Sequence, residues 1–276
     1  MEKEIFDFFT ALVEKVAGIS YSSGKEYLIE SRLNELALSL GYENVKALYQ
    51  AIIKKRADIK LINDIIDALT TNETYFFRDY HPFETLRVHI FPELFKKKED
   101  EKRINIWSAA CSTGQEPYSI AMLILEYFPQ FLQNYKISIL ATDISKKCLE
   151  KAKIGIYNQI EINRGLPIAF LVKYFKQQGA HWYIDEKVKK LVKFERMNLL
   201  EASKRLFERF DLILCRYVLI YFSEEAKKKV TLDLWKMLNP GGYLFLGATE
   251  ISAITFPDMV KKVLNKTLCY YKKNTR

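Results

Sequence analysis

The stretch INIWSAACSTGQEPYSIAM (residues 104–122) joins a short apolar segment to a loop of small residues and then to the start of an amphipathic helix. Residues 104–109 have the length and composition of a buried strand, and Pro117 stands where a first helical turn favours proline. The loop contains one glycine, Gly114, so it is neither a Walker phosphate loop nor a GxGxxG motif. Small residues let a ligand approach the backbone closely, so the stretch predicts a ligand-binding turn after the first strand of an α/β domain.

Apolar segments and amphipathic helices alternate from residue 83 to the end of the chain. The predicted strands are residues 104–109, 137–142, 191–196, 210–216, 243–247 and 267–272. This alternation is typical of a doubly wound, mostly parallel sheet with helices on both faces. The run Asn239-Pro240-Gly241-Gly242 predicts a break before the fifth strand. Residues 155–190 form too long a connection for one crossover, so they predict a small insertion of their own.

The N-terminal part of the chain has a different pattern. Apolar residues recur at helical spacing through residues 1–70, as at Leu33, Leu36 and Leu40, which predicts an all-helical domain. Residues 71–82 include the polar and aromatic run TNETYFFRD (residues 71–79), which fits neither a helical nor a strand period. We interpret residues 71–82 as a linker that contributes to the site and residues 83–276 as the cofactor-binding domain.

The composition narrows the class of protein. The chain has 276 residues and a net charge of +9, with no apolar run near the roughly 20 residues that cross a bilayer. The N-terminus lacks the features of a secretory signal, so we expect a soluble cytoplasmic protein without membrane insertion. The four cysteines and three histidines are scattered, which predicts buried thiols and no metal site. The basic surplus lies in residues 146–196; a solvated lysine surface is one interpretation and nucleic-acid binding is the other.

Polar residues follow the first four predicted strands. They are Glu116 after the first, Asp143 after the second, Asn198 beside Leu199 after the third, and Arg216 with Tyr217 at the end of the fourth. Because parallel strands end at one edge of the sheet, these residues predict a nucleoside site there, with Asp143 on a ribose and Glu116 on a cationic amino group. The alternatives are local: Glu116 as a helix-start acid and Asp143 as the cap of the next helix.

Six segments of the chain resemble the chemotaxis receptor glutamate methyltransferases, the CheR family. They are TNETYFFRD (71–79), WSAACSTGQEPYSIAM (107–122), ATDIS (141–145), KAKIGIY (151–157), MNLL (197–200) and CRYVLIYF (215–222). The resemblance implies a class I fold that binds S-adenosylmethionine (SAM), with a small β-subdomain and an N-terminal helical docking domain. The reaction it implies is methyl transfer to glutamate carboxylates of chemoreceptors.

The resemblance also implies roles for particular residues. Asn72, Thr74 and Arg78 would close over the cofactor, with Glu116 near its methionine end and Asp143 on the ribose. Asn198, Leu199, Arg216 and Tyr217 would line the remaining wall, and Arg78 and Tyr221 would lie nearest the methyl group. An acceptor glutamate is ionised at neutral pH because its reference pKa is near 4.3, so no general base is needed.

Three departures from the family pattern bear on substrate binding. Relatives usually have Asn in place of Tyr217, which leaves the contacts of this side chain open. Lys25 and Arg32 are the basic residues expected to dock the cytoplasmic helical region of chemoreceptors, although Glu35 and Leu38 stand where more basic residues are common. Residues 179–188 are too short for the insertion that accompanies a C-terminal pentapeptide tether, so we expect no tether.

We expect the enzyme to act as a monomer. Two alternatives stay open from the sequence, a SAM-dependent nucleic-acid methyltransferase and a non-catalytic receptor adaptor.

Overall fold

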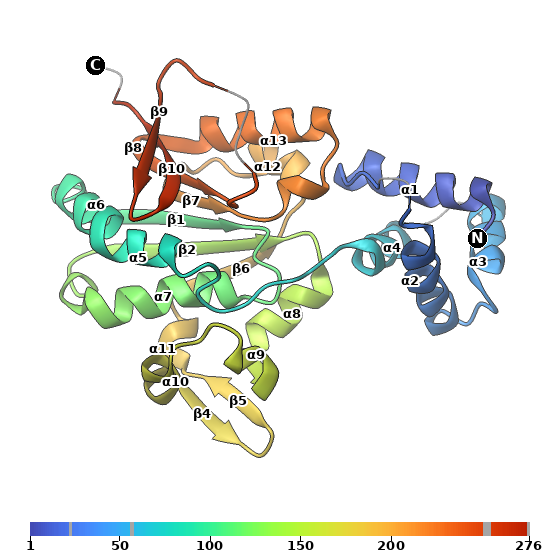
Figure 1. The fold of residues 1–276 in the computed structure, drawn as a ribbon, viewed down its shortest axis with the longest axis horizontal. Helices are drawn as coiled ribbons and strands as arrows, with labels where there is room; N and C mark the ends of the chain where they lie inside the picture. The colour runs from blue at the N-terminus through green and yellow to red at the C-terminus, as the bar shows by residue number, and fades with distance from the viewer. Residues whose placement is uncertain (22–23, 56–57, 251–254, 275–276) are drawn as a thin grey trace.

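The computed structural model describes residues 1–21, 24–55, 58–250 and 255–274. Figure 1 shows a twisted sheet flanked by helices, a helical group set to one side of it, and a small sheet projecting from another side. A segment that follows the helical group crosses to the first helix of the sheet domain, so that it passes between the two larger parts.

The helical group contains α1–α4. Their bounds are α1 Lys3–Ala17, α2 Glu26–Ser39, α3 Val45–Lys55 and α4 Ile59–Leu69. On α1 the buried residues recur every four positions, at Ile5, Phe9, Val13 and Ala17, so one stripe of the helix faces the core. The helix ends at Gly18, whose φ of 74° is readily adopted only by glycine.

The main sheet has seven strands in the order β6-β2-β1-β7-β8-β10-β9. Their bounds are β1 Arg103–Ala109, β2 Lys136–Asp143, β6 Val192–Arg196, β7 Phe210–Cys215, β8 Leu238–Leu246, β9 Met259–Leu264 and β10 Thr267–Lys272. The first five in spatial order are parallel, and β10 and β9 are antiparallel to their neighbours. The chain moves outward from β1 in both directions, which confirms the predicted doubly wound sheet.

The strands differ from the prediction in two places. β8 begins at Leu238, earlier than predicted, and the predicted break at residues 239–242 lies within it as an interruption of the pairing with β7, between the pairs Leu238–Phe210 and Tyr243–Leu212. β9 was not predicted; its residues alternate between partly buried and exposed at the edge of the sheet. The other strand ends agree within one residue, β7 ending at Cys215 and leaving Arg216 in the following loop.

Helices cover both faces of the main sheet (Figure 1). Their bounds are α5 His81–Thr85, η1 Leu86–Ile90, α6 Phe91–Lys97, α7 Gln115–Tyr127, η2 Pro129–Phe131, α8 Lys146–Ile154, η3 Leu199–Glu201, α12 Ala202–Arg205, η4 Leu219–Tyr221 and α13 Glu224–Met237. One buried cluster joins the helical group to the sheet, including Phe9, Leu33, Trp107 and Leu234. The helical group therefore shares a core with one face of the sheet.

The insertion contains a three-stranded antiparallel sheet in the order β3-β5-β4. Its elements are β3 Ile156–Asn158, α9 Gln159–Asn163, α10 Ile168–Tyr174, β4 Phe175–Gln178, β5 His181–Ile184 and α11 Glu186–Lys189. Tyr157 is fully buried, and its hydroxyl donates to the Thr113 carbonyl oxygen at 2.8 Å. A Cβ atom on Gly165 would overlap the Phe76 carbonyl oxygen. The insertion therefore supports both the loop after β1 and the linker.

Candidate functional site

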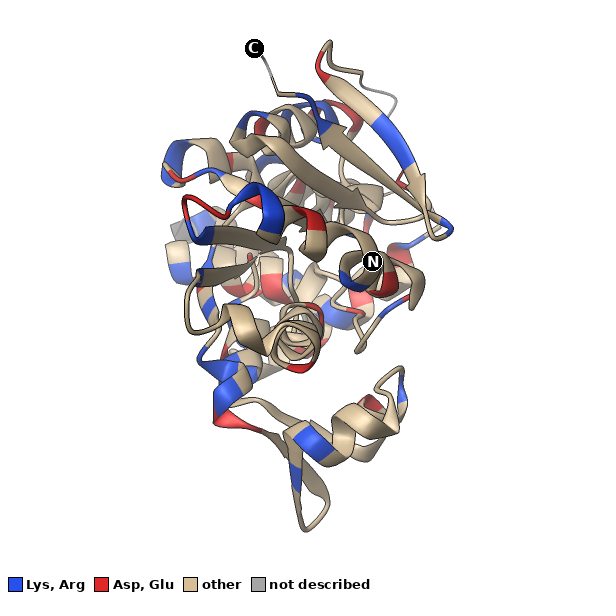
Figure 2. Ribbon diagram, turned by 90° about the vertical axis from the view of Figure 1, so that its left-hand side faces the viewer, with Lys and Arg blue, Asp and Glu red and all other residues tan. Residues whose placement is uncertain are grey.

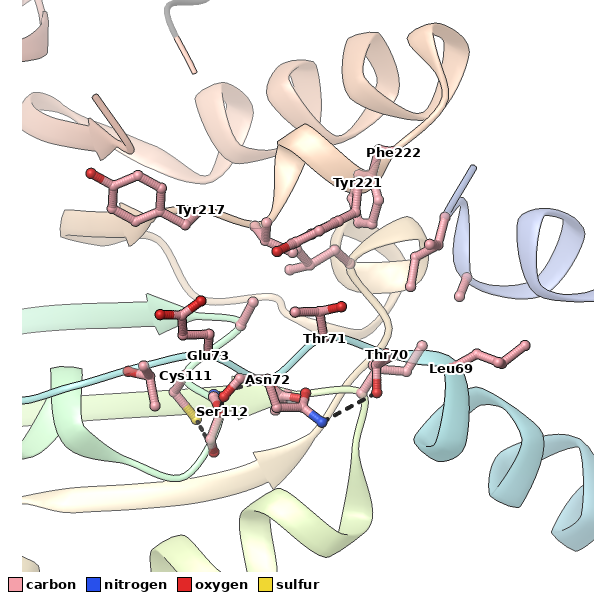
Figure 3. Close-up of a pocket in the computed structure, with 18 of the residues that line it drawn as sticks. Leu69, Thr70, Thr71, Asn72, Glu73, Cys111, Ser112, Tyr217, Tyr221 and Phe222 are labelled. Atoms are coloured by element: carbon pink, nitrogen blue, oxygen red, sulfur yellow. Dashed lines mark hydrogen bonds between the residues drawn. The ribbon is translucent and has the colours of Figure 1, made fainter. Parts of the chain in front are cut away.

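A cleft opens where the helical group, the linker and the carboxyl ends of β1, β2 and β7 meet. Figure 3 shows Tyr217 and Tyr221 on one side of this cavity, with Asn72 and Ser112 on the opposite side. The strand order reverses between β1 and β7, which is where ligands bind in open α/β sheets.

All the residues predicted for the site line this one cleft. They are Lys25, Arg32, Asn72, Thr74, Arg78, Glu116, Asp143, Asn198, Leu199, Arg216, Tyr217 and Tyr221. They come from several segments that lie far apart in the chain, so only the folded structure brings them together. Their individual roles stay predictions.

The loop after β1 has a contorted backbone. Ala110, Ser112 and Gly114 have φ angles of 62°, 50° and 93°, and a Cβ atom on Gly114 would lie 2.9 Å from that of Ala152. Positive φ is uncommon for residues other than glycine and concentrates at functional sites. The conformation points the Ser112 N–H at an oxygen of Asp143, at 2.7 Å.

Asp143 lies at the end of β2 and is 6% exposed. Its second oxygen accepts the Ser145 N–H at 2.9 Å. Burial raises the pKa of this carboxyl to about 6, against the lowering effect of these backbone hydrogen bonds. The cap of α8 is Ser145, whose hydroxyl accepts the Cys148 N–H, so the alternative that made Asp143 the helix cap is wrong.

Glu116 belongs to a buried ion-pair chain. One of its oxygens accepts the Ser108 hydroxyl at 2.8 Å, and the other lies 3.1 Å from a guanidinium nitrogen of Arg216. Arg216 also lies 2.6 Å from the Asp79 carboxylate and donates to the Arg78 carbonyl oxygen at 2.9 Å. This chain ties the linker to the ends of β1 and β7.

The linker presents Arg78 at the cleft. The Arg78 guanidinium donates to the Glu73 carbonyl oxygen at 2.8 Å, while the Glu73 carboxylate pairs with Arg164 of the insertion. The Arg78 guanidinium also lies over the ring of Tyr217, 3.8 Å from its centroid. Arg78 therefore makes no ion pair with Asp79 or with the Glu73 carboxylate, and its charge faces the cleft.

Two of the predicted residues, Asn198 and Tyr221, join the helical group to the sheet domain, whereas Arg32 ties α2 to the end of α4 within the helical group. The Asn198 amide donates to the Val16 carbonyl oxygen at 2.6 Å, and Arg32 donates to the Leu69 and Thr70 carbonyl oxygens. The Tyr221 carbonyl oxygen accepts the Ser20 N–H at 2.8 Å. These contacts occupy the Asn198 amide and part of the Arg32 guanidinium, whereas Lys25 is exposed.

Sequence reasoning missed three residues that hold the site together: Asp79, Ser112 and Glu250. Asp79 and Ser112 lie inside motifs that had been recognised, but their partners are more than 30 positions away. Glu250 is 7% exposed and accepts the backbone N–H groups of Tyr217, Ile220 and Gly247. No periodic pattern in the sequence identifies Glu250 as a site residue. The one indication was its position a few residues after the end of β8.

The donors and acceptors of the cleft fit a nucleoside that carries an amino-acid tail. Each oxygen of Asp143 accepts one backbone N–H and keeps a second lone pair, which suits the two hydroxyl donors of a ribose. The acid Glu116 and the cation Arg78 line the same cleft, so it offers a partner of each charge for an amino-acid tail; Arg216 lines it too but is already paired with Glu116 and Asp79. Fold and site together define the class I SAM-dependent methyltransferases.

Comparisons with known proteins place the chain more narrowly. The CheR methyltransferase SAM-binding domain matches residues 72–268, and the CheR methyltransferase all-alpha domain matches residues 4–70. The chain belongs to the CheR methyltransferase family, and it is a SAM-dependent methyltransferase.

Named relatives are similar along most of their length. Chemotaxis protein methyltransferase 1 of Pseudomonas aeruginosa is 42% identical over 248 residues, which cover 89% of this chain and 89% of the relative. The chemotaxis protein methyltransferase of Vibrio parahaemolyticus is 42% identical over 246 residues, covering 88% and 87%. That of Borreliella burgdorferi is 39% identical over 236 residues, covering 84% and 83%.

Two further features of the described residues bear on the class of protein. No helix among residues 1–21, 24–55, 58–250 and 255–274 is long and apolar enough to span a membrane. Within the same ranges, no group of three or more His, Cys, Asp or Glu side chains is placed to hold a metal ion.

Proposed function

We propose that this enzyme transfers methyl groups from SAM to glutamate side chains in the cytoplasmic helical region of chemoreceptors, giving glutamyl methyl esters and S-adenosylhomocysteine. The observation that carries the proposal is the cleft itself, which opens between the helical group and the carboxyl ends of β1, β2 and β7. The names of the relatives support a role in chemotaxis. The proposed reaction needs no metal ion. The proposed partner region is cytoplasmic, so we place the enzyme in the cytoplasm as well.

Asp143 would hold the ribose, and Glu116 with Arg216 would hold the charged tail of the cofactor. Asn72, Thr74, Asn198 and Leu199 would line the remaining wall. Bound SAM supplies a methyl group made electrophilic by the positive charge on its sulfur. The protein has to bring a carboxylate into line with that methyl group and exclude water from between them.

Arg78 and Tyr221 are the residues proposed to act nearest the transfer. Arg78 carries a guanidinium that no carboxylate of the described residues neutralises within ion-pair distance, and it would orient a carboxylate of substrate or cofactor. Tyr221 stands at the cleft where η4 meets the helical group and would donate a hydrogen bond beside the acceptor. The acceptor glutamate needs no base because it is already ionised.

Receptor docking is proposed for the mouth of the cleft on the helical group. Lys25 is exposed at the cleft, and Arg32 lies half-buried two helical turns further along. Tyr27 is 85% exposed in the first turn of α2, so this end of the helix offers an aromatic ring beside the Lys25 cation. The hairpin of β4 and β5 turns within two residues, which supports an enzyme that binds receptor helices without a tether. A monomeric enzyme is part of the same proposal.

The basic surplus of residues 146–196 gives little support to the nucleic-acid alternative. Seven of its twelve Lys and Arg side chains are in ion pairs: Lys146, Lys151, Arg164, Lys173, Lys187, Lys189 and Lys193. Figure 2 shows acidic segments beside the basic ones. Phosphate binding favours uncompensated cations, so this distribution favours a solvated surface.

The test is incubation with labelled SAM and receptor fragments, comparing the native enzyme with Arg78→Ala. We expect base-labile methyl groups, released as methanol, from the native enzyme and a loss of at least about 100-fold in the variant, because electrostatic positioning near the reacting atoms typically contributes that much. Arg87→Ala is the matched control, since Arg87 pairs with Glu84 outside the cleft. Undiminished labelling by Arg78→Ala would show that Arg78 is misassigned. Labelling of RNA or DNA instead of receptor would overturn the proposed substrate, and a failure to turn over SAM would favour the adaptor.

A further inference from the structure

Tyr217 has a backbone conformation that an aromatic residue rarely adopts. It follows β7 by two residues and has a φ of 58°. One oxygen of Glu250 accepts both the Tyr217 N–H, at 2.6 Å, and the Gly247 N–H, at 2.8 Å. A Cβ atom on Gly247 would lie 2.9 Å from the Tyr217 nitrogen. A buried carboxylate and a closely packed glycine therefore impose the direction of the Tyr217 side chain.

The ring of Tyr217 forms one face of the Arg78 site. The Arg78 guanidinium carbon lies 3.8 Å from the Tyr217 centroid, well within the distance of about 6 Å at which a cation is attracted to an aromatic face. The ring of Tyr75 is further away, at 5.4 Å. Tyr217 is thus the nearer of the two aromatic rings that hold this cation.

The hydroxyl of Tyr217 binds the neighbouring residue of the linker. It donates to the Asp79 carboxylate, which also pairs with Arg216. Burial, and then the hydrogen bond to Asp79, raise the pKa of Tyr217, so the hydroxyl stays protonated and remains a donor near neutral pH. One side chain therefore contacts two consecutive linker residues, Arg78 by its ring and Asp79 by its hydroxyl.

We infer that Tyr217 is the positioning residue that holds Arg78 at the cleft, stacking on its guanidinium while anchoring the linker through Asp79. The inference rests on the proposed function for the role of Arg78 in the reaction. It assigns a task to the one site residue whose side-chain contacts the sequence left open.

A double-mutant cycle tests the coupling of the two residues. The variants are Tyr217→Asn, Tyr217→Phe, Arg78→Ala and the pair Arg78→Ala with Tyr217→Asn. Asn tolerates positive φ, so Tyr217→Asn removes the ring without disturbing the backbone, and Tyr217→Phe keeps the ring without the hydroxyl. Three properties are measured: urea unfolding of the free protein, affinity for S-adenosylhomocysteine by calorimetry, and kcat and KM with receptor fragments.

We expect Tyr217→Asn to lower kcat about 10-fold, because a cation–π contact accounts for a factor of this order. Tyr217→Phe should lower kcat only about 3-fold, because it keeps the ring and loses the hydrogen bond to Asp79. In the Arg78→Ala background, Tyr217→Asn should change kcat and ligand affinity less than about 2-fold. Tyr127→Asn is the matched control, because Tyr127 stacks on Arg87 at 5.0 Å and does not line the cleft. It should leave both kinetic constants unchanged.

The inference is overturned if Tyr217→Asn costs as much without Arg78 as with it, or if Tyr217→Phe is as impaired as Tyr217→Asn. Failure of the proposed substrate gives a different result. In that case the native enzyme binds S-adenosylhomocysteine but does not label receptor fragments. The double-mutant cycles measured by urea unfolding and by ligand affinity still show whether Tyr217 and Arg78 are coupled. A coupling energy of zero in both measurements would show that the contact between the Tyr217 ring and the Arg78 guanidinium contributes no free energy.

Discussion

The two walls of the cleft are built in different ways. The sheet wall, residues 110–116 with Asp143, is held by backbone N–H groups whose partners lie 2 and 31 positions away. The linker wall, residues 72–79 with Arg216 and Tyr217, is held by side chains that meet across 137 and 138 positions. Backbone hydrogen bonds at adjoining strand ends maintain the sheet wall, whereas a few charged and aromatic contacts maintain the linker wall.

We expect this structural difference to separate effects on cofactor binding from effects on the rate of methyl transfer. The sheet wall offers a nucleoside the hydrogen-bond acceptors of Asp143 and a backbone that it can approach closely. The cofactor has to bind in the same geometry in every catalytic cycle. The linker wall carries Arg78, and three of its positions, Phe77, Asp79 and Tyr217, have positive φ. Strained backbone persists only where surrounding contacts impose it.

We therefore expect changes in the sheet wall to act on cofactor affinity, and changes at Arg78 or at the residues that hold it, Asp79 and Tyr217, to act on turnover. Asn72, Thr74 and Arg216 belong to the linker wall but are proposed to contact the cofactor, so changes there should affect both.

The largest effect expected in the sheet wall is that of Asp143→Asn. The amide can offer only one oxygen to the two backbone N–H groups, and it loses the charge that strengthens hydrogen bonds from ribose hydroxyls. We expect a fall in affinity for S-adenosylhomocysteine of about 100-fold, roughly 2.7 kcal/mol. Calorimetry measures it. Asp185→Asn is the control, because Asp185 caps α11 away from the cleft.

The same carboxylate predicts the pH dependence of native binding. The folded-state pKa of Asp143, about 6, lies above its ordinary value of 3.8, so ionising it costs stability above about pH 6 and costs nothing below about pH 4. Only the ionised form accepts both ribose hydroxyls, so affinity should be level from pH 7 to 8 and fall as the pH drops through 6. Asp143→Asn should remove this dependence. An unchanged slope in the variant would assign it to another group.

In the linker wall, Glu250→Gln tests the strained backbone. Gln cannot accept all three N–H groups of Tyr217, Ile220 and Gly247, so one donor is left opposite an amide N–H. We expect a loss of about 2 kcal/mol in the free energy of unfolding and a several-fold lower kcat, with little change in affinity for S-adenosylhomocysteine. Urea denaturation and methyl-transfer kinetics measure these. Glu225→Gln, at an exposed position, is the control. A loss of cofactor affinity equal to the loss of kcat would contradict the division between the walls.

The smallest effect concerns the contact between the end of α1 and the start of α13, next to Tyr221. The Gly18 carbonyl oxygen accepts the Ser223 N–H at 2.9 Å, and a Cβ atom on Gly18 would lie 2.9 Å from that of Ala226 on α13. Gly41 has a similar φ of 82°, and a Cβ atom added there would meet nothing within 4 Å. Gly41→Ala should cost about 1 kcal/mol from backbone strain, and Gly18→Ala about 1 kcal/mol more from the contact. Equal losses on denaturation would show that this contact has room to relax.

The sequence by itself determined the doubly wound sheet, the helical group and the residues that gather at the cleft. Apolar periodicity is a local property, and parallel strands end at one edge, so polar residues after successive strands converge without further information. Motif resemblance added the linker residues and the family, which the comparisons confirm. β9 escaped because Lys261 and Lys262 interrupt its apolar residues, so the segment shows neither a continuous apolar run nor a strict alternation.

Only the tertiary structure decided which side chains hold one another. Asp79 pairs with Arg216 rather than with its neighbour Arg78, and Asn198 uses its amide on the helical group. Glu250 fixes Tyr217 from 33 positions away, and Tyr217 in turn contacts a linker residue 138 positions earlier. Such pairings depend on the distance and direction of side chains after the chain has packed. No local pattern encodes them, because many polar residues in the sequence have the same chemistry and the fold selects among them.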